Sequence, residues 1–87
     1  MMTVDELTSR LSAYRSQRMD RVIQSLLDDG ARQDDIEIQC HPDRVCIMCW
    51  NDTVAEYSTR FDDGKMVLWI EETLFGGRAT TRMQFGR

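Results

Sequence analysis

The residues with the most obvious chemical potential are Cys40, His41, Cys46 and Cys49, the only histidine and all three cysteines of the chain. They fall within the short stretch CHPDRVCIMC. Thiolates and imidazole nitrogens are the ligands that zinc prefers in proteins. If the four side chains converged, this stretch would form a zinc or thiol-redox site.

The spacing argues against convergence, because the stretch reads as two strands joined by the turn HPDR. Residues three apart in a strand point to opposite faces, so Cys46 faces away from Cys49. A register that pairs Cys40 with Val45 leaves Cys40 about 13 Å from Cys49, too far for a disulfide or a shared metal. We therefore predict structural thiols with no metal and no cofactor, and retain a zinc-binding or thiol-redox protein as an alternative.

No other grouping predicts catalysis. Glu71 and Glu72 are adjacent on a predicted strand, so they point to opposite faces and cannot act as a pair. The Asp62-Asp63-Gly64 segment reads as a turn, since the later ligands of a calcium loop are missing. We expect a protein that is not an enzyme.

The composition is that of a small globular domain. The chain has 87 residues, a formal net charge of −4 and 30% charged residues. An acidic balance disfavours general nucleic-acid binding, which depends on neutralising phosphates. The N-terminal segment MMTVDELTSR lacks the apolar core of a signal peptide, and no apolar run is long enough for a membrane span. We expect no membrane partner and a cytoplasmic protein.

A long helix is predicted over residues 4–29. Thr3 and Glu6 have the spacing of a capping box, and Gly30 is well placed to end the helix. The apolar stripe of its first half (Val4, Leu7, Leu11 and Tyr14) is rotated by roughly 110° from that of its second half (Met19, Val22, Ile23, Leu26 and Leu27). The helix therefore either breaks near residues 15–18 or packs its two halves against different surfaces, the second of which implies a partner.

After Gly30 the apolar residues alternate, which predicts strands. Five strands are expected, with inward residues Ile36, Ile38, Cys40; Val45, Ile47, Cys49; Ala55, Tyr57, Thr59, Phe61; Met66, Leu68, Ile70, Leu74; and Ala79, Thr81, Met83, Phe85. The turns are HPDR, one around Asn51-Asp52, Asp63-Gly64 and Gly76-Gly77; Asp-Gly and Gly-Gly are strong hairpin signals.

These turns predict specific registers. HPDR pairs Ile38 with Ile47, Asp63-Gly64 pairs Phe61 with Met66 and Tyr57 with Ile70, and Gly76-Gly77 pairs Ile70 with Met83 and Leu68 with Phe85. The connection around Asn51-Asp52 keeps the apolar residues on one face only if it contributes an odd number of residues. Residues 1–87 are thus predicted to form a single α+β domain, with the N-terminal helix on one face of a five-stranded antiparallel meander.

The opposite, outer face of this sheet carries the most informative surface. A single antiparallel sheet covered by one helix leaves its second face in water. Alternation places Met48, Trp50, Val67 and Trp69 on that face, with Arg60 and Arg82 at their rim. Tryptophan, methionine and arginine on a wet face are typical of interface hot spots.

These observations predict a small protein-binding module. The predicted contact residues are Met48, Trp50, Val67, Trp69, Arg60 and Arg82, together with Arg15 and Arg18 of the helix. The partner is a larger protein complex, on which the module acts as an inhibitor or adaptor. Small acidic α+β proteins recur among phage-encoded inhibitors of host defence, an analogy of size and charge alone. The alternative is a structural homodimer through the same outer face.

Overall fold

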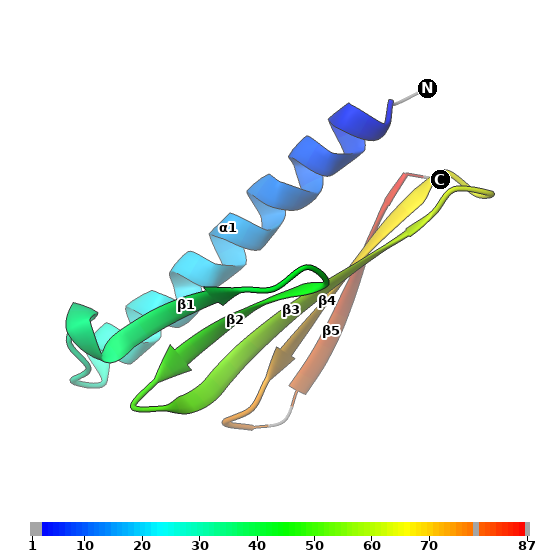
Figure 1. The fold of residues 1–87 in the computed structure, drawn as a ribbon. Coiled ribbons are helices and arrows are strands. Elements are labelled where there is room, and N and C mark those ends of the chain that lie inside the picture. Colours follow the sequence, from blue (N-terminus) through cyan, green and yellow to red (C-terminus); the bar gives the residue numbers. More distant parts are fainter. Residues whose placement is uncertain (1–2, 78, 87) are drawn as a thin grey trace.

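A computed structural model describes residues 3–77 and 79–86 of the chain. One helix, α1 (Val4–Asp28), is followed by a short 3₁₀ turn, η1 (Gln33–Asp35), and by five strands: β1 (Ile36–Cys40), β2 (Arg44–Cys49), β3 (Asp52–Asp62), β4 (Val67–Leu74) and β5 (Ala79–Gly86). The strands form one antiparallel sheet in the order β1-β2-β3-β4-β5, and α1 covers one of its faces (Figure 1). The predicted α+β architecture is confirmed.

The sequence signals at both ends of α1 are confirmed. At the N-terminus the Glu6 amide donates to the Thr3 hydroxyl at 3.2 Å. At the C-terminus Gly30 adopts a φ of 104°, a conformation that favours glycine. Its amide donates to the Leu27 carbonyl and the Ala31 amide donates to the Leu26 carbonyl. This pair of bonds is the Schellman motif, which satisfies carbonyls that the helix itself leaves unpaired.

Of the two alternatives for the helix, a break near residues 15–18 is wrong, because α1 is continuous from Val4 to Asp28. Both halves pack on the same sheet. The first half touches β5 through Tyr14 and Phe85, and the chain enters β1 at the opposite edge soon after the helix ends. The helix therefore crosses the sheet, and its buried side rotates gradually along its length. The rotation of the apolar stripe reflects this crossing, so it requires no second surface and no partner.

Two of the predicted registers are confirmed and one is wrong. Ile38 pairs with Ile47 in the first hairpin, and Ile70 pairs with Met83 in the last. In the β3–β4 hairpin, however, Tyr57 lies opposite Glu72 and not Ile70. The turn is a four-residue loop (63–66), in which the Lys65 amide donates to the Asp62 carboxylate at 3.2 Å. The two registers differ by an even number of residues, so each strand keeps its apolar face inward.

The connection between β2 and β3 contributes the odd number of residues that the sequence requires, because a bulge adds one residue to a two-residue turn. Trp50 and Asn51, one position before the expected turn, form a two-residue turn with φ values of 51° and 67°, as a type I′ turn requires. The register shifts after Ile47: Ile47 pairs with Ala55 and Met48 with Thr53, which leaves Val54 as the extra residue. The parity condition is thereby met.

The core lies between α1 and the central strands of the sheet, and the two fully buried residues that the helix contributes belong to its first half. Its buried residues, from α1, β2, β3 and β4, are Leu7, Leu11, Ile47, Ala55, Tyr57, Leu68 and Ile70. Towards both edges the same face of the sheet is open, since one helix is too narrow to cover five strands. Ile38 on β1 and Met83 on β5 are 48% and 40% exposed.

Candidate functional site

The cysteines and the histidine do not gather at one point. Cys40 pairs with Val45, whereas Cys49 pairs with Ile36 at the other end of the β1–β2 hairpin. Cys40 is exposed, in contrast to the buried position that its strand pattern predicts, while Cys46 and Cys49 are buried. Within residues 3–77 and 79–86, no three His, Cys, Asp or Glu side chains are grouped as metal ligands. Burial, with the charge of Asp35, raises the pKa of the Cys49 thiol, which therefore remains protonated and unreactive at neutral pH.

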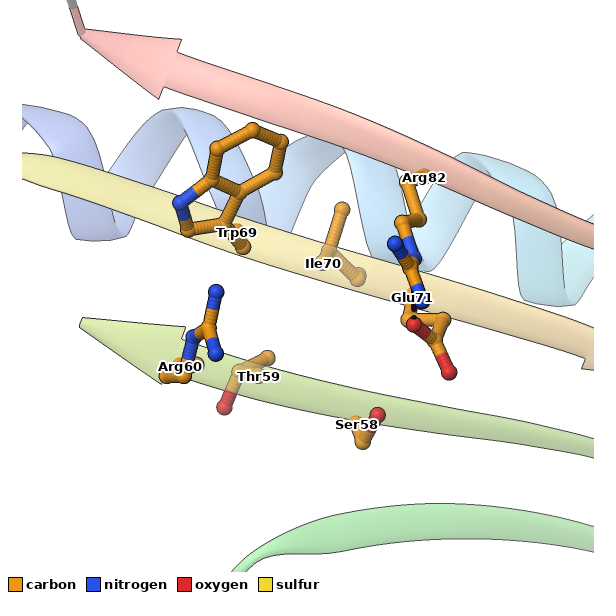
Figure 2. A pocket seen from close by; sticks show the side chains of 7 residues that line it. All are labelled: Ser58, Thr59, Arg60, Trp69, Ile70, Glu71 and Arg82. Atoms are coloured by element: carbon orange, nitrogen blue, oxygen red, sulfur yellow. Dashed lines mark hydrogen bonds and ion pairs between the residues drawn. The ribbon is translucent and has the colours of Figure 1, made fainter. Parts of the chain in front are cut away.

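The outer face of β3, β4 and β5 carries the group of residues that is best placed to bind a partner. Trp69 on β4 lies opposite Arg60 on β3 and Gln84 on β5. Figure 2 looks onto this face with α1 behind the sheet, and shows Arg60 and Trp69 side by side on neighbouring strands. A shallow hollow of about 250 Å³ opens here, lined by Ser58, Thr59, Arg60, Trp69, Ile70, Glu71 and Arg82.

The two arginines at this hollow, Arg60 and Arg82, differ in whether the guanidinium is already bonded to a carboxylate of the protein. The Arg82 guanidinium donates to the Glu71 carboxylate at 2.7 Å, an exposed cross-strand ion pair that orients the side chain. Arg60 is exposed, and no side chain in the described part of the chain forms a hydrogen bond or ion pair with its guanidinium. Its guanidinium is thus available for a bidentate bond to a carboxylate.

A second hollow, of about 1030 Å³, adjoins the first and shares Arg60 and Trp69 with it. It continues past the β3–β4 loop, where Lys65 lies, and reaches α1 at Leu7. Val67 is only 3% exposed, so it forms part of the floor and offers little contact area. We call Arg60, Lys65, Trp69, Glu71 and Arg82 the Trp69 site.

The structure does not bring the other predicted contact residues to this site. Trp50 is 63% exposed in the turn that connects β2 to β3. β3 begins two residues later, at Asp52, and Arg60 lies eight residues further along that strand. Eight strand residues span about 26 Å, so Trp50 and the neighbouring Met48 belong to the far end of the sheet. Alternation identified the correct face but not the position along it.

The helix arginines lie in the other layer of the protein. Arg15 is partly exposed on α1, which covers the inner face of the sheet, whereas Trp69 stands on the outer face. Arg18 is bound within the protein: its guanidinium donates to the Glu72 carboxylate at 2.6 Å and 3.2 Å. A flat partner surface that meets Trp69 would therefore not reach these two arginines.

Glu72, which sequence reasoning missed, lies between Arg18 and Tyr57. The Tyr57 hydroxyl also donates to the Glu72 carboxylate, at 2.7 Å, and the Glu72 side chain is only 3% exposed. We call Arg18, Tyr57 and Glu72 the buried triad. Glu72 follows Leu68 and Ile70 on the inward side of β4, and Arg18 stands four residues after Tyr14 and seven after Leu11. The sequence therefore held a signal for this contact: α1 and β4 each carry one charged residue, Arg18 and Glu72, at a position where the apolar pattern expects an inward side chain.

The charge state of the triad follows from these contacts. Burial by itself would raise the pKa of Glu72, but the hydrogen bonds from Arg18 and Tyr57 and the positive charge of Arg18 outweigh it, and the pKa is lowered. Burial and the bond to Glu72 raise the pKa of Tyr57. The triad therefore consists of an ionised carboxylate, a guanidinium and a neutral phenol.

This lowered pKa makes a prediction about acid stability. Glu72 contributes its full stabilisation above its ordinary pKa of 4.5 and loses it as the pH falls through the lower folded value. Between neutral pH and strongly acidic conditions, the wild type should lose more free energy of unfolding than a Glu72→Gln variant, which has no proton to bind there. Urea unfolding at a series of pH values measures both curves. Parallel curves would show that Glu72 titrates normally in the folded protein.

The described helix has no stretch long and apolar enough to cross a membrane. No protein-family description, curated protein or solved structure matches the chain at a significant level.

Proposed function

We propose that this protein is a small, non-enzymatic protein-binding module that acts as an inhibitor or adaptor on a larger protein complex, and that it binds through the Trp69 site. The observation that carries the proposal is the position of Trp69. Its indole is partly exposed on the uncovered face of the sheet, where two hollows meet, beside an arginine whose guanidinium has no partner among residues 3–77 and 79–86. Tryptophan and arginine are both among the residues most enriched at interface hot spots.

The chemistry of the site favours an acidic contact region on the partner. Arg60 and Lys65 add positive charge next to the indole, which Asp62 in the same hollow offsets in part, although the chain as a whole carries −4. Arg82 is already held by Glu71, so of the two described arginines at this hollow Arg60 is the one whose guanidinium can bind a carboxylate. The indole would supply apolar contact area, and the guanidinium would supply direction and specificity.

The same chemistry supports a binding role over catalysis. The side chains of the Trp69 site are an indole, two guanidinium groups, an ammonium group and a carboxylate that is bound to one of the arginines. These groups recognise and orient, but none is a nucleophile with an adjacent base. A cytoplasmic setting and an inhibitory role, by analogy with small acidic phage proteins, are the finer parts of this proposal and rest on size and charge.

The outer-face homodimer is the weaker alternative. A two-fold axis through Trp69 would bring the basic site of one copy against the same basic site of the other. Such juxtaposition of like charges opposes association. An acidic partner surface avoids this cost.

The test compares the two tryptophans. Trp69→Asp should abolish capture of the partner from a lysate of the source organism, and with the recovered partner it should weaken binding by about 30-fold or more, since truncated hot spots cost at least about 2 kcal/mol. Trp50→Asp is the matched control, because Trp50 is the other tryptophan and is more exposed; it should bind normally. Circular dichroism confirms that both variants fold. Loss of binding in the Trp50 variant with normal binding in the Trp69 variant would refute the proposed site.

A further inference from the structure

The positive charge that is available at the Trp69 site is narrow. Arg60 lies on the outer face of β3, and the same side of this strand carries Glu56 four positions before it and Asp62 two positions after it. Strand residues are spaced by about 3.3 Å, so these carboxylates lie about 13 Å and about 7 Å from Arg60 along the strand. Glu56 has only a long ion pair, with the Arg44 guanidinium at 3.9 Å. The Arg60 guanidinium is therefore a single cation between two acidic residues.

The other cations of the site do not widen this positive region, because each lies next to carboxylates. Arg82 donates to Glu71 at 2.7 Å. Lys65 follows Asp62 and Asp63 in the β3–β4 loop, and Asp62 lines the same hollow as Lys65. The charged residues that line the two hollows are thus three cations and two carboxylates, so this lining carries +1.

The rest of the chain has the opposite charge. The whole chain carries −4, so the part outside this lining carries −5, the difference between −4 and +1. A partner surface that is acidic over a standard contact area of roughly 800 Å² would cover Glu56, Asp62 and Asp63 as well as Arg60. Like charges that face each other oppose association. The attraction for acidic groups is therefore limited to the immediate surroundings of Arg60.

We propose that the partner docks a short segment in which one carboxylate and one apolar side chain lie next to each other and the flanking residues are neutral or basic. This inference rests on the proposed function. Arg60 binds the carboxylate through two parallel hydrogen bonds, and Trp69 packs against the apolar group. Because Arg60 lies directly opposite Trp69 on the neighbouring strand (Figure 2), their Cβ atoms are about 5 Å apart. The two anchors of the partner are correspondingly close, at i and i+2 of an extended chain or i and i+4 of a helix.

A chain of closely spaced anions does not fit the same surface. Single-stranded nucleic acid also binds through aromatic and arginine side chains, but it carries a phosphate at every nucleotide. A second anion next to the first would meet Asp62 or Glu56 along β3. Among the residues that line the two hollows, no second cation is without a neighbouring carboxylate. A tail of successive acidic residues meets the same obstacle, so the site selects an isolated carboxylate.

Panning a library of random dodecapeptides on the full chain tests the proposal, with the Trp69→Asp variant used to remove peptides that bind elsewhere. The retained peptides should share one acidic residue within four positions of an apolar residue, without enrichment of a second acidic residue. A synthetic copy of one such peptide should bind Arg60→Ala about tenfold more weakly or worse, because a charged hydrogen bond is lost. Arg44→Ala is the matched control, since Arg44 lies on the same face of β2 and is held by Asp43 at 3.1 Å; it should bind as the wild type does.

A second set of variants tests the flanking carboxylates directly. Adding an aspartate two positions from the acidic residue of the peptide should weaken its binding to the wild type by about threefold, the size of a cross-strand like-charge effect. The Glu56→Gln, Asp62→Asn double variant should remove this penalty. An equal or tighter binding of the doubly acidic peptide to the wild type would overturn the proposal.

The outcomes separate this inference from the proposed function. Enrichment of peptides with several acidic residues, all dependent on Trp69, would overturn the isolated carboxylate and leave the protein-binding site in place. A complete absence of binding peptides would refute docking of a short segment, while capture of the partner still tests the proposed function. Peptides that bind Trp69→Asp as well as the wild type would refute the Trp69 site itself. Trp69-dependent binding of a short oligothymidylate would overturn both proposals.

Discussion

Replacing Glu72 with alanine should lower the free energy of unfolding by about 3 kcal/mol, the lower end of what removing one partner of a buried ion pair costs. The variant leaves the Tyr57 hydroxyl, whose ring is fully buried, without its acceptor. It also leaves the Arg18 guanidinium without its carboxylate. Because the Arg18 side chain is 28% exposed and can turn towards water, the upper end of the range is not expected. Urea unfolding at neutral pH measures the loss.

Glu71→Ala is the matched control for this prediction. Glu71 is the neighbouring residue on the same strand and also pairs with an arginine, at 2.7 Å, but Arg82 is 71% exposed. Exposed ion pairs contribute at most about 1 kcal/mol, so this variant should unfold almost as the wild type does. Equal losses in the two variants would mean that the buried triad contributes no more than a surface pair.

The triad matters for the site as well as for stability, because the observed register of β3 and β4 is the one that places Tyr57 opposite Glu72. Asp63-Gly64 favours a two-residue turn, which would pair Tyr57 with Ile70 and would also move Arg60 from Trp69 to Val67. The observed register instead places Tyr57 opposite Glu72, where the hydroxyl and carboxylate bond to each other. The same strands carry the triad on their inner faces and Arg60 and Trp69 on their outer faces. The register that forms the buried bond is therefore the same register that makes Arg60 and Trp69 neighbours.

The parts of the fold that local signals specify were predictable from the sequence. Alternation identified all five strands and their inward faces, and the capping residues located both ends of α1. The β3–β4 register was not predictable in this way. A shift by two residues preserves every apolar face, and only contacts between distant residues, Arg18 with Glu72 and Tyr57 with Glu72, distinguish the two registers.

The candidate site was predictable in its composition and only partly in its geometry. Trp69, Arg60 and Arg82 were expected on the outer face and lie together there. Trp50 was grouped with them because alternation assigns a face and carries no information about distance along a strand. Arg18 was expected at a partner surface because arginine suits planar, bidentate contacts with other proteins. Its place on the inward stripe, after Leu11 and Tyr14, is explained only by the glutamate that meets it across the core.

Because alternation assigns a residue to a face of the sheet but not to a position under the helix, it also misses a difference within the β1–β2 hairpin. Ile38 and Ile47 lie directly opposite each other on the inner face, and by sequence they are equivalent core residues. The structure separates them, since Ile47 is 0% exposed beneath the helix and Ile38 is 48% exposed beyond its edge. Ile47→Ala should therefore cost about 3 kcal/mol of unfolding free energy, within the range for buried isoleucines, and Ile38→Ala less than about 1 kcal/mol.

Urea unfolding of the two alanine variants tests more than the burial of one side chain. The substitutions are chemically identical and lie at directly paired positions, so the main difference between them is the burial of the side chain that is removed. The difference in unfolding free energy therefore reports how far α1 extends over the β1–β2 hairpin. If the helix crosses the sheet as described, the difference is about 2 kcal/mol or more. Nearly equal losses would mean that the helix, or a second copy of the chain, covers Ile38 in solution, and the position of α1 on the sheet would have to be revised.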